Sequence, residues 1–307
     1  MAMTGVIRPG YIQLRVTDVE AAITHYVERV GLDLVSREAD GRIYLKSYDE
    51  FDHHSFILNP ATEAGFDRMG FKVAAESDLD HFKGRLQAEG LEVEEVAAGS
   101  QPGLGRVIAF QLPSGHRIEL YHDIAQAEKH PAIVNPNIWS EIPRGMKATR
   151  FDHALLYGPG IARVKEIFER ALDFKTAEYV ETPDKGYLAI WMTCSTKAHD
   201  IAFVECPEAG KFHHAAFYLE NWQDIGNAAD IMTVFDIPID IGPTRHGITR
   251  GQTIYFFDPS GNRNEVFAGG YTYYPDNPTR YWEPDHTGRG IFYYERRLNE
   301  AFLTVYT

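Results

Sequence analysis

The 307-residue sequence has few cysteines, a minority of basic residues and no long hydrophobic run. Two cysteines, Cys194 and Cys206, are too few for the disulfide framework of a small secreted domain. The N-terminal sequence MAMTGVIRPG has no apolar segment like that of a signal peptide, and no apolar run is long enough to cross a bilayer. We therefore expect a cytoplasmic protein rather than a secreted or membrane protein.

Acidic residues outnumber basic ones, with 44 Asp+Glu against 30 Lys+Arg and a formal net charge of -14. A negatively charged protein repels a phosphate backbone and an anionic membrane surface, so we expect no nucleic-acid or membrane partner. The hydrophobic content of 44% and the aromatic content of 13% are typical of a globular protein with a sizeable core. The length predicts one large domain or two domains of about 150 residues each.

The sequence repeats itself with a long period. Residues 105–121 read GRVIAFQLPSGHRIELY and residues 251–267 read GQTIYFFDPSGNRNEVF, so Gly, Ile, Phe, Pro, Ser, Gly, Arg and Glu recur 146 positions later. Shorter similarities precede this block, since YIQLRV corresponds to DHALLY and MGFKVAAESDL corresponds to HHAAFYLENWQDI. The chain therefore contains two similar halves.

Each half reads as two units with one common pattern. An alternating, strand-like run is followed by an amphipathic helix and then by two or three strands separated by Gly or Pro turns. Four such units account for residues 6–270. We predict an α+β fold with four βαβββ modules in two tandem domains, residues 1–146 and 147–307, with a linker around residues 135–147, where prolines interrupt any regular pattern. The aromatic tail after residue 270 is expected to pack over the second half or a neighbouring subunit.

A comparison of the halves locates residues that only the second half has. With the two copies of the repeated block aligned, matching the earlier strands extends the comparison over each half. The aligned pairs, second half first, are Glu265 and Glu119, Asp258 and Leu112, Tyr255 and Ala109, His246 and Ser100, His214 and Gly70, and His153 and Gln13. The first half lacks every histidine of this set, so we expect it to be structural and the chain to hold one metal ion.

Three residues of the second half form a candidate metal site. His153 and His214 lie in the opening strands of the two modules, and Glu265 lies in the last strand. These side chains converge if the modules close face to face. Two imidazoles and one carboxylate leave three coordination positions open, which suits non-haem Fe(II) with O2 and a chelating substrate. The helical H-E-x-x-H motif of thermolysin-like zinc sites is absent.

Each of these residues also has a purely structural interpretation. A single histidine in a strand is commonly a packed or surface side chain, and Glu119 persists in the first half without histidine partners. His213, next to His214, is expected to point to the opposite face of the strand. Tyr255, in the run IYFF, could be a core aromatic residue. Only the joint pattern favours a metal site.

The run TRHGITRGQTIYFFDPSGNRNE at residues 244–265 resembles the signature of extradiol ring-cleavage dioxygenases, with a His, an apolar residue and a Tyr, an Asp-Pro-x-Gly turn and a Glu in succession. The whole chain resembles the catechol 2,3-dioxygenase (metapyrocatechase) group, from VIRPG through FDHALLYG, STKAHDIAF and IDIGPTRHG to FLTVYT. The resemblance implies the glyoxalase/bleomycin-resistance-like fold of the vicinal oxygen chelate superfamily, which is built from paired βαβββ modules.

The resemblance also implies roles for individual residues. His199, in KAHD, matches the acid/base histidine of the family, and His246 and Tyr255 match residues that hydrogen-bond the substrate oxygens. The implied ligands of Fe(II) are His153, His214 and Glu265. The residues implied to line the aromatic pocket are Trp191, Ile248 and Phe302.

The implied activity is extradiol (meta) cleavage of catechol or alkylcatechols by O2, which gives a 2-hydroxymuconic semialdehyde in aromatic-compound catabolism. The implied cofactor is Fe(II), the implied partners are a small catecholic substrate and O2, and the implied assembly is a homotetramer. Trp191 stands where a Phe or a smaller apolar residue is expected. The preferred ring substituent therefore stays open among catechol, 3-methylcatechol and 4-methylcatechol.

Two other classes of function stay open on the sequence. A non-oxidative lyase or isomerase of the same superfamily would use the metal as a Lewis acid and usually has four protein ligands, but IAFV at residues 201–204 offers no fourth ligand. A non-catalytic ligand-binding protein has no need for His199, His246 and Tyr255 around a metal group. The sequence therefore favours the oxygenase.

Overall fold

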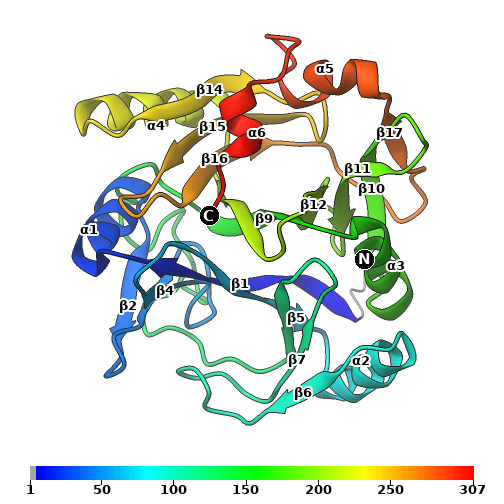
Figure 1. Ribbon diagram of the computed structural model, residues 1–307. Coiled ribbons are helices and arrows are strands. Elements are labelled where there is room, and N and C mark those ends of the chain that lie inside the picture. The colour runs from blue at the N-terminus through cyan, green and yellow to red at the C-terminus, as the bar shows by residue number, and fades with distance from the viewer. Residues whose placement is uncertain (1–4) are drawn as a thin grey trace.

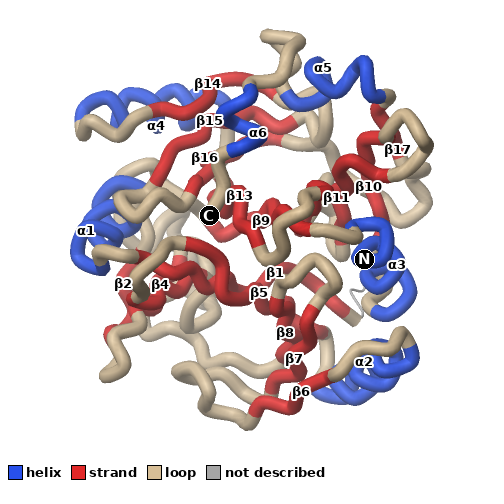
Figure 2. The backbone as a smooth tube through the Cα atoms, in the orientation of Figure 1, coloured by secondary structure: helices blue, strands red, loops and turns tan. Residues whose placement is uncertain are grey.

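The computed structural model describes residues 5–307. Each half of the chain forms one β-sheet, and Figure 1 shows the N-terminal half (blue to cyan) below the C-terminal half (green to red). Figure 2 shows strands running through the centre of both halves, with helices at the periphery. Each half contains two βαβββ modules, which confirms the predicted fold class.

The N-terminal half contains an eight-stranded sheet and three helical segments, one of them a π-helix (η1) that continues α1. Its elements are β1 (Val6–Val16), α1 (Val19–Ile23), η1 (Thr24–Val30), β2 (Asp33–Arg37), β3 (Ile43–Lys46), β4 (Phe56–Pro60), β5 (Gly65–Val73), α2 (Glu76–Ala88), β6 (Val93–Val96), β7 (Val107–Gln111) and β8 (Arg117–Tyr121).

The C-terminal half contains a nine-stranded sheet. Its two modules consist of β9 (Arg150–Gly158), α3 (Ile161–Ala171), β10 (Lys175–Glu181), β11 (Tyr187–Thr193), β12 (Ile201–Glu205), β13 (Lys211–Tyr218), α4 (Trp222–Val234), β14 (Ile239–Arg245), β15 (Gly251–Phe257) and β16 (Arg263–Gly269). The tail adds β17 (Arg280–Trp282), a 3-10 turn η2 (Pro284–His286), α5 (Thr287–Ile291) and α6 (Glu300–Thr304).

The two sheets share one strand order, β2-β3-β4-β1-β5-β8-β7-β6 in the first and β10-β11-β12-β9-β13-β16-β15-β14 in the second. The opening strands of the two modules are antiparallel neighbours at the centre, and each also pairs in parallel with the last strand of its own module. The second sheet gains β17 beside β10, so the tail packs on the C-terminal half.

The helices follow from local sequence signals. α4 begins at Asn221, whose side-chain oxygen accepts hydrogen bonds from the backbone N–H groups of Gln223 and Asp224, as an N-cap residue does. α3 has one apolar face at helical spacing, and its buried residues are Ile161, Val164, Ile167, Phe168 and Ala171.

One hydrophobic core joins the two halves. The rings of Phe56 and Phe217 lie 5.1 Å apart, and those of Phe71 and Phe174 lie 5.4 Å apart, in each case across the two halves. These contacts belong to a single cluster of buried residues that both sheets contribute to. Separate, smaller clusters fill the other face of each sheet. In the C-terminal half, that other face carries the candidate site.

The connection between the sheets, residues 122–149, runs from β8 to β9 without a named helix or strand. We propose that the two domains divide at residues 146 and 147, inside this connection. Within residues 5–307, no helix combines the length and the apolar character that crossing a membrane requires.

Candidate metal centre

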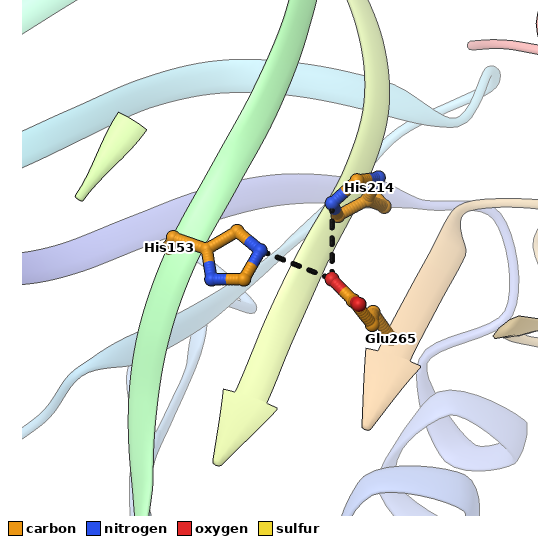
Figure 3. A group of neighbouring side chains, drawn as sticks. All are labelled: His153, His214 and Glu265. Atoms are coloured by element: carbon orange, nitrogen blue, oxygen red, sulfur yellow. Dashed lines mark hydrogen bonds and ion pairs between the residues drawn. The ribbon is translucent and has the colours of Figure 1, made fainter. Parts of the chain in front are cut away.

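Three side chains from neighbouring strands form a buried group that can hold a metal ion. Figure 3 shows His153 on β9, His214 on β13 and Glu265 on β16 pointing toward one another. Oε2 of Glu265 lies 3.0 Å from Nε2 of His153 and 3.2 Å from Nε2 of His214. The ligand atoms all lie within 4.8 Å of one another, and the three residues are 2%, 3% and 1% exposed. The structure thus brings together the three predicted metal ligands.

The strand register explains this convergence. β13 lies between β9 and β16, and Ala216 on β13 pairs with both His153 and Glu265. Side chains of directly paired residues point to the same face of a sheet, so His153 and Glu265 share a face. His214 lies two residues before Ala216 and therefore belongs to that face as well.

In both histidines, Nδ1 contacts the side chain of the residue directly before the histidine in the chain. Nδ1 of His153 lies 2.9 Å from Oδ2 of Asp152, and Nδ1 of His214 lies 2.7 Å from Nδ1 of His213. The expectation that His213 points away from His214 is wrong, because a β-bulge in β13 interrupts the alternation of side chains. Nε2 of each ligand histidine is left to face Glu265.

The donor set fits a divalent transition metal. Imidazole nitrogen and carboxylate oxygen are both ligands of such ions, and three protein ligands leave coordination positions for substrates. Burial acts to raise the pKa of Glu265, but the neighbouring His153 and His214 rings hold it well below its usual range. The carboxylate is therefore ionised in a buried place, where a charge needs a positive partner. A bound cation supplies that partner.

His199 lies in the loop before β12 and packs against His153, with 4.0 Å between the ring centroids. Its side chain lines the same cavity as the metal-binding group. Burial, reinforced by the nearby His153, lowers the pKa of His199 well below 6.5. The ring is therefore neutral, and a neutral imidazole in this position can accept a proton.

His246 and Tyr255 form a hydrogen-bonded pair at the same cavity. Nε2 of His246 lies 2.9 Å from the hydroxyl of Tyr255, while Nδ1 of His246 contacts the backbone carbonyl of Ile291. A carbonyl only accepts, so Nδ1 carries the proton and Nε2 accepts from the Tyr255 hydroxyl. The Tyr255 oxygen keeps lone pairs that can accept a hydrogen bond from a bound ligand.

All nine site residues predicted from the sequence line one cavity of about 40 Å³. Trp191 comes from β11, Ile248 follows β14, and Phe302 comes from α6. These three side chains are buried, at 5%, 2% and 5% exposed. The further residues around the cavity are Leu155, Thr249, Phe267 and Ile291.

The strand register corrects the alignment of the two halves. In the first half, Gly70 pairs with both Tyr11 and Glu119, in the way that Ala216 pairs with the two ligands in the second half. Tyr11 is therefore the counterpart of His153. The alignment predicted from the sequence is therefore two residues out of register. The alternation of apolar and polar residues does not reveal this error, because a shift of two residues along a strand keeps every side chain on the same face of the sheet.

The counterpart of His214 is accordingly Arg68, and the first half has a salt bridge where the second half has its metal-binding group. Nη1 of Arg68 lies 3.1 Å from Glu119, and Nε of Arg117 lies 2.8 Å from it. The hydroxyl of Tyr11 donates to the same carboxylate. Because these cations already neutralise Glu119, we propose that the first half binds no metal.

Sequence reasoning missed the residues that support the ligands and part of the cavity wall. Asp152 and His213 each directly precede a ligand, so the pairs Asp-His and His-His are the available signal. Leu155 lies two positions after the first ligand and hence on its face of β9, which the strand periodicity also predicts. Ile291 and Thr249 reach the cavity from the end of α5 and from a loop, and no sequence pattern marks them.

Comparisons with known proteins identify relatives of this chain. The model of the catechol 2,3-dioxygenase-like N-terminal domain matches residues 66–129, and that of the glyoxalase/bleomycin resistance protein/dioxygenase superfamily matches residues 150–266. A metapyrocatechase from Pseudomonas sp. (strain CF600) is 48% identical over 304 residues, which cover 99% of each chain. A manganese-dependent 2,3-dihydroxybiphenyl 1,2-dioxygenase from Geobacillus genomosp. 3 is 31% identical and covers 93% of this chain and 92% of its own.

Solved structures identify relatives as well. The 2,3-dioxygenase LapB from Pseudomonas sp. KL28 superposes with a TM-score of 0.90 at 46% identity, covering 92% of this chain and 99% of that one. Homoprotocatechuate 2,3-dioxygenase from Brevibacterium fuscum, in an anaerobic complex with 3,4-dihydroxyphenylacetate, superposes with a TM-score of 0.87 at 26% identity, covering 98% and 92%. The resemblance inferred from the sequence is confirmed, and the chain belongs to the extradiol dioxygenases, in the metapyrocatechase group of the vicinal oxygen chelate superfamily.

Proposed function

We propose that the protein cleaves the ring of catechol or an alkylcatechol next to its two hydroxyls with O2, at Fe(II) bound by His153, His214 and Glu265. The product is a 2-hydroxymuconic semialdehyde. The observation that carries this proposal is the buried two-histidine, one-glutamate group in an enclosed, largely apolar cavity. The 48% identity to a metapyrocatechase supports the same reaction and substrate class.

The three ligands leave room for more than one substrate. A divalent iron in this group would favour an ionised catechol and bring both of its oxygens next to O2. The 31% identity to a manganese-dependent relative makes Mn(II) the competing ion, because the same donor types suit both metals. We choose Fe(II) because two histidines and one carboxylate with open coordination positions are the ligand set of non-haem Fe(II) oxygenases.

His199 moves protons in this proposal. Its neutral ring lies against His153 and faces the cavity, so a ring nitrogen can accept a proton from a catechol hydroxyl. The same nitrogen then returns the proton to an oxygen of the reacting substrate. Burial lowers the pKa of His199, which keeps the ring uncharged until the substrate supplies the proton and favours the return of that proton to the substrate.

His246 and Tyr255 orient the substrate oxygens. The carbonyl of Ile291 fixes the tautomer of His246, and the Tyr255 hydroxyl then donates to it. The oxygen of Tyr255 is thereby turned as an acceptor toward the cavity. Tyr255 thus holds a catechol hydroxyl in place, and His246 fixes the orientation of the Tyr255 hydroxyl.

A second cavity of about 300 Å³ supports alkyl-substituted substrates. It shares Leu155, Trp191, Ile291 and Phe302 with the cavity at the metal-binding group. Apolar side chains predominate in its wall, among them Val180, Leu188, Ala189, Val204 and Leu303. An alkyl group on the ring gains free energy by leaving water for such a wall.

A non-oxidative lyase or isomerase is the principal alternative. In the described chain, the candidate metal group has three members rather than four. His246 is the next nearest ring, with Nε2 3.7 Å from Oε1 of Glu265, but both of its nitrogens already have partners in Tyr255 and Ile291. A three-ligand site with open positions favours the oxygenase.

The deciding experiment measures oxygen uptake and visible absorbance together after catechol is added to anaerobically Fe(II)-loaded protein. The proposal expects one O2 per catechol, a yellow ring-fission product and one iron per chain. Protein loaded with Mn(II) serves as the comparison for the choice of metal. Iron in the site with neither oxygen uptake nor yellow product, for catechol and for alkylcatechols, contradicts the oxygenase and leads to the non-oxidative reactions.

We further propose that the protein acts as a homotetramer in the cytoplasm. Both cysteines, Cys194 and Cys206, are free thiols, which suits a reducing compartment in which iron also stays divalent. The connection from β8 to β9, residues 122–149, carries exposed apolar side chains, and exposed apolar surface of this kind supports self-association.

A further inference from the structure

Two β-bulges lie beside the metal ligands. In the pairing of β13 with β9, Phe212 pairs with Leu156 and His214 with Leu155, which leaves His213 as an extra residue on β13. Further along, Ala216 pairs with His153 and the next residue of β13 pairs with Phe151, which leaves Asp152 as an extra residue on β9. Each extra residue directly precedes a ligand histidine.

The bulges turn the extra side chains toward the ligands. In a regular strand, neighbouring side chains point to opposite faces and do not meet. Here Oδ2 of Asp152 lies 2.9 Å from Nδ1 of His153, and Nδ1 of His213 lies 2.7 Å from Nδ1 of His214. The opposite nitrogen of His213 lies 2.7 Å from the carbonyl oxygen of Phe302 on α6. Each ligand histidine is thereby contacted at Nδ1, the nitrogen that faces away from Glu265.

The same two bulges occur in the N-terminal half without this chemistry. In the pairing of β1 with β5, Gly10 and Asp67 are the extra residues, each directly before the counterpart of a ligand. A side chain at Gly10 would collide with Tyr121, and Asp67 bonds to Arg15 and Asn59. The bulges therefore belong to the repeated fold, and the hydrogen bonds to ligands belong to the C-terminal half alone.

We propose that the bulge residues Asp152 and His213 are positioning residues that fix the tautomers and orientations of the two metal-binding histidines. This inference rests on the proposed metal centre. A carboxylate accepts, so Nδ1 of His153 carries the proton and Nε2 carries the lone pair that a metal needs. Asp152 thereby selects the ligating nitrogen of His153.

The tautomer of His214 is fixed through His213, which contacts both His214 and the carbonyl of Phe302. The carbonyl of Phe302 only accepts, so Nε2 of His213 carries a proton and its Nδ1 is an acceptor. His214 must then donate from Nδ1, which leaves its Nε2 with a lone pair directed at Glu265. A main-chain carbonyl on the C-terminal helix thus determines which nitrogen of His214 faces the metal.

The surroundings hold both positioning residues in place. Asp152 is 1% exposed, and Arg150 and Lys197 lie 2.9 Å and 3.4 Å from its Oδ1, so its charge is balanced while Oδ2 stays with His153. His213 is 0% exposed, and its ring stacks on Tyr157 at a centroid distance of 5.0 Å. These contacts keep each side chain against its ligand histidine.

The test is the affinity for Co(II) or Mn(II), measured by competition with a chelator, together with the visible spectrum of the Co(II) protein. His213→Phe and Asp152→Ala are each expected to bind the metal about 10- to 100-fold more weakly, the usual effect of losing such a partner. His213→Gln keeps an amide N–H for Phe302 and an oxygen for His214, so it should recover part of the affinity. The Co(II) spectrum should shift in His213→Phe and return toward that of the wild type in His213→Gln.

The matched control is Asp67→Asn, which alters the corresponding bulge of the N-terminal half and should leave metal affinity unchanged. Thermal unfolding in the presence of a chelator shows whether each variant folds without metal. Wild-type affinity in His213→Phe and Asp152→Ala, or an equal loss in Asp67→Asn, overturns the positioning role. A wild-type protein that binds neither metal overturns the metal centre itself, so the two failures are distinguishable.

Discussion

At the scale of single residues, the neighbours of a glutamate decide whether it can bind a metal. Glu265 faces the Nε2 atoms of two histidines, whereas Glu119 at the same strand position is bonded by Arg68 and Arg117. An arginine has no lone pair to offer and supplies the positive charge that a metal would otherwise bring. The sequence predicts the contrast between the halves because histidines at the two ligand positions occur only in the second copy of the repeat.

Replacement of His199 separates proton transfer from metal binding. His199→Asn removes a group that faces the cavity without belonging to the metal-binding group. The turnover number should fall by about 10² to 10⁴, the usual contribution of a general acid or base, with iron content unchanged. His153→Ala is the comparison and should lose iron and activity together. Full activity of His199→Asn with catechol means that another group handles the proton.

Replacement of Trp191 tests the substituent preference. Its side chain lies in the walls of both cavities, so the smaller ring in Trp191→Phe leaves more space where the two cavities meet. The ratio of kcat/KM for alkylcatechols to that for catechol should rise, by an amount within the about 1 to 3 kcal/mol that one methylene is worth in such pockets. Leu34→Ala, at an exposed position in the first half, should leave the ratio unchanged. An unchanged ratio in Trp191→Phe removes the second cavity from substrate selection.

At the scale of elements, the order of strands and helices is predictable from the sequence and the strand register is not. Each βαβββ unit has its own periodicity and turns, so all four modules are expected before any contact is known. The bulges at Asp152 and His213 depend on which residues of two strands face each other. For the same reason, the sequence alignment that places Gly70 opposite His214 is two residues out of register.

One buried cation contacts the C-terminal segment. Arg263 on β16 is 1% exposed, its Nε lies 2.9 Å from Asp240, and its Nη1 donates to the carbonyl of Val305 at 2.6 Å. Arg263→Leu leaves Asp240 and that carbonyl without their donor, and breaking a buried pair in this way costs about 3 to 5 kcal/mol. Urea unfolding measures this loss, and limited proteolysis should cut the tail after α5.

The matched control for Arg263→Leu is an exposed ion pair. Lys185 and Glu181 lie 2.6 Å apart at the surface, and Lys185→Ala should leave the free energy of unfolding nearly unchanged, because exposed ion pairs contribute little to stability. Equal stability of the two variants means that the buried cation does not hold the tail.

At the scale of the whole molecule, the two halves are one folding unit with one site. The repeat in the sequence predicts two similar halves, but it does not reveal that their helices and sheets share a core. The hydroxyl of Tyr26 of η1 donates across the halves to Oδ2 of Asp258 or Oδ1 of Asn264, which lie 3.0 Å and 3.1 Å away, and Nε2 of His25 lies 3.0 Å from the side-chain nitrogen of Asn264. The N-terminal half therefore supports the strand that carries Glu265.

Stability should fall below neutral pH because histidines are buried in the N-terminal half. Burial lowers the pKa of His25 and His54 to about 3 and that of His116 to about 4, from an ordinary 6.5. The folded protein keeps these rings neutral, whereas the unfolded chain takes up a proton on each as the pH drops below 6.5. Each ring therefore contributes full stability above pH 6.5 and loses up to about 1.4 kcal/mol per pH unit between 6.5 and its folded pKa.

Urea unfolding of the metal-free protein at several pH values between 7 and 5 measures this slope. His54→Gln removes one of these titrating groups and should make the dependence shallower. Replacement of the exposed His286 is the control and should not change it. A stability that stays constant over this range means that these rings are not neutral in the fold or do not titrate on unfolding.

Self-association should depend on the connection between the two sheets. Its apolar side chains are exposed to an unusual degree for a monomer, and contiguous exposed apolar surface commonly marks an interface. These residues are Ile133 (66%), Val134 (77%), Ile138 (90%), Trp139 (43%) and Ile142 (85%). Light scattering of the wild type should give about four times the chain mass of 34.8 kDa, and Ile138→Lys with Ile142→Lys should give a smaller particle. Val234→Lys, at a residue on α4 that is 72% exposed, is the matched control and should remain a tetramer. A wild-type particle of one chain, or a doubly substituted protein that stays tetrameric, excludes this segment as the subunit contact.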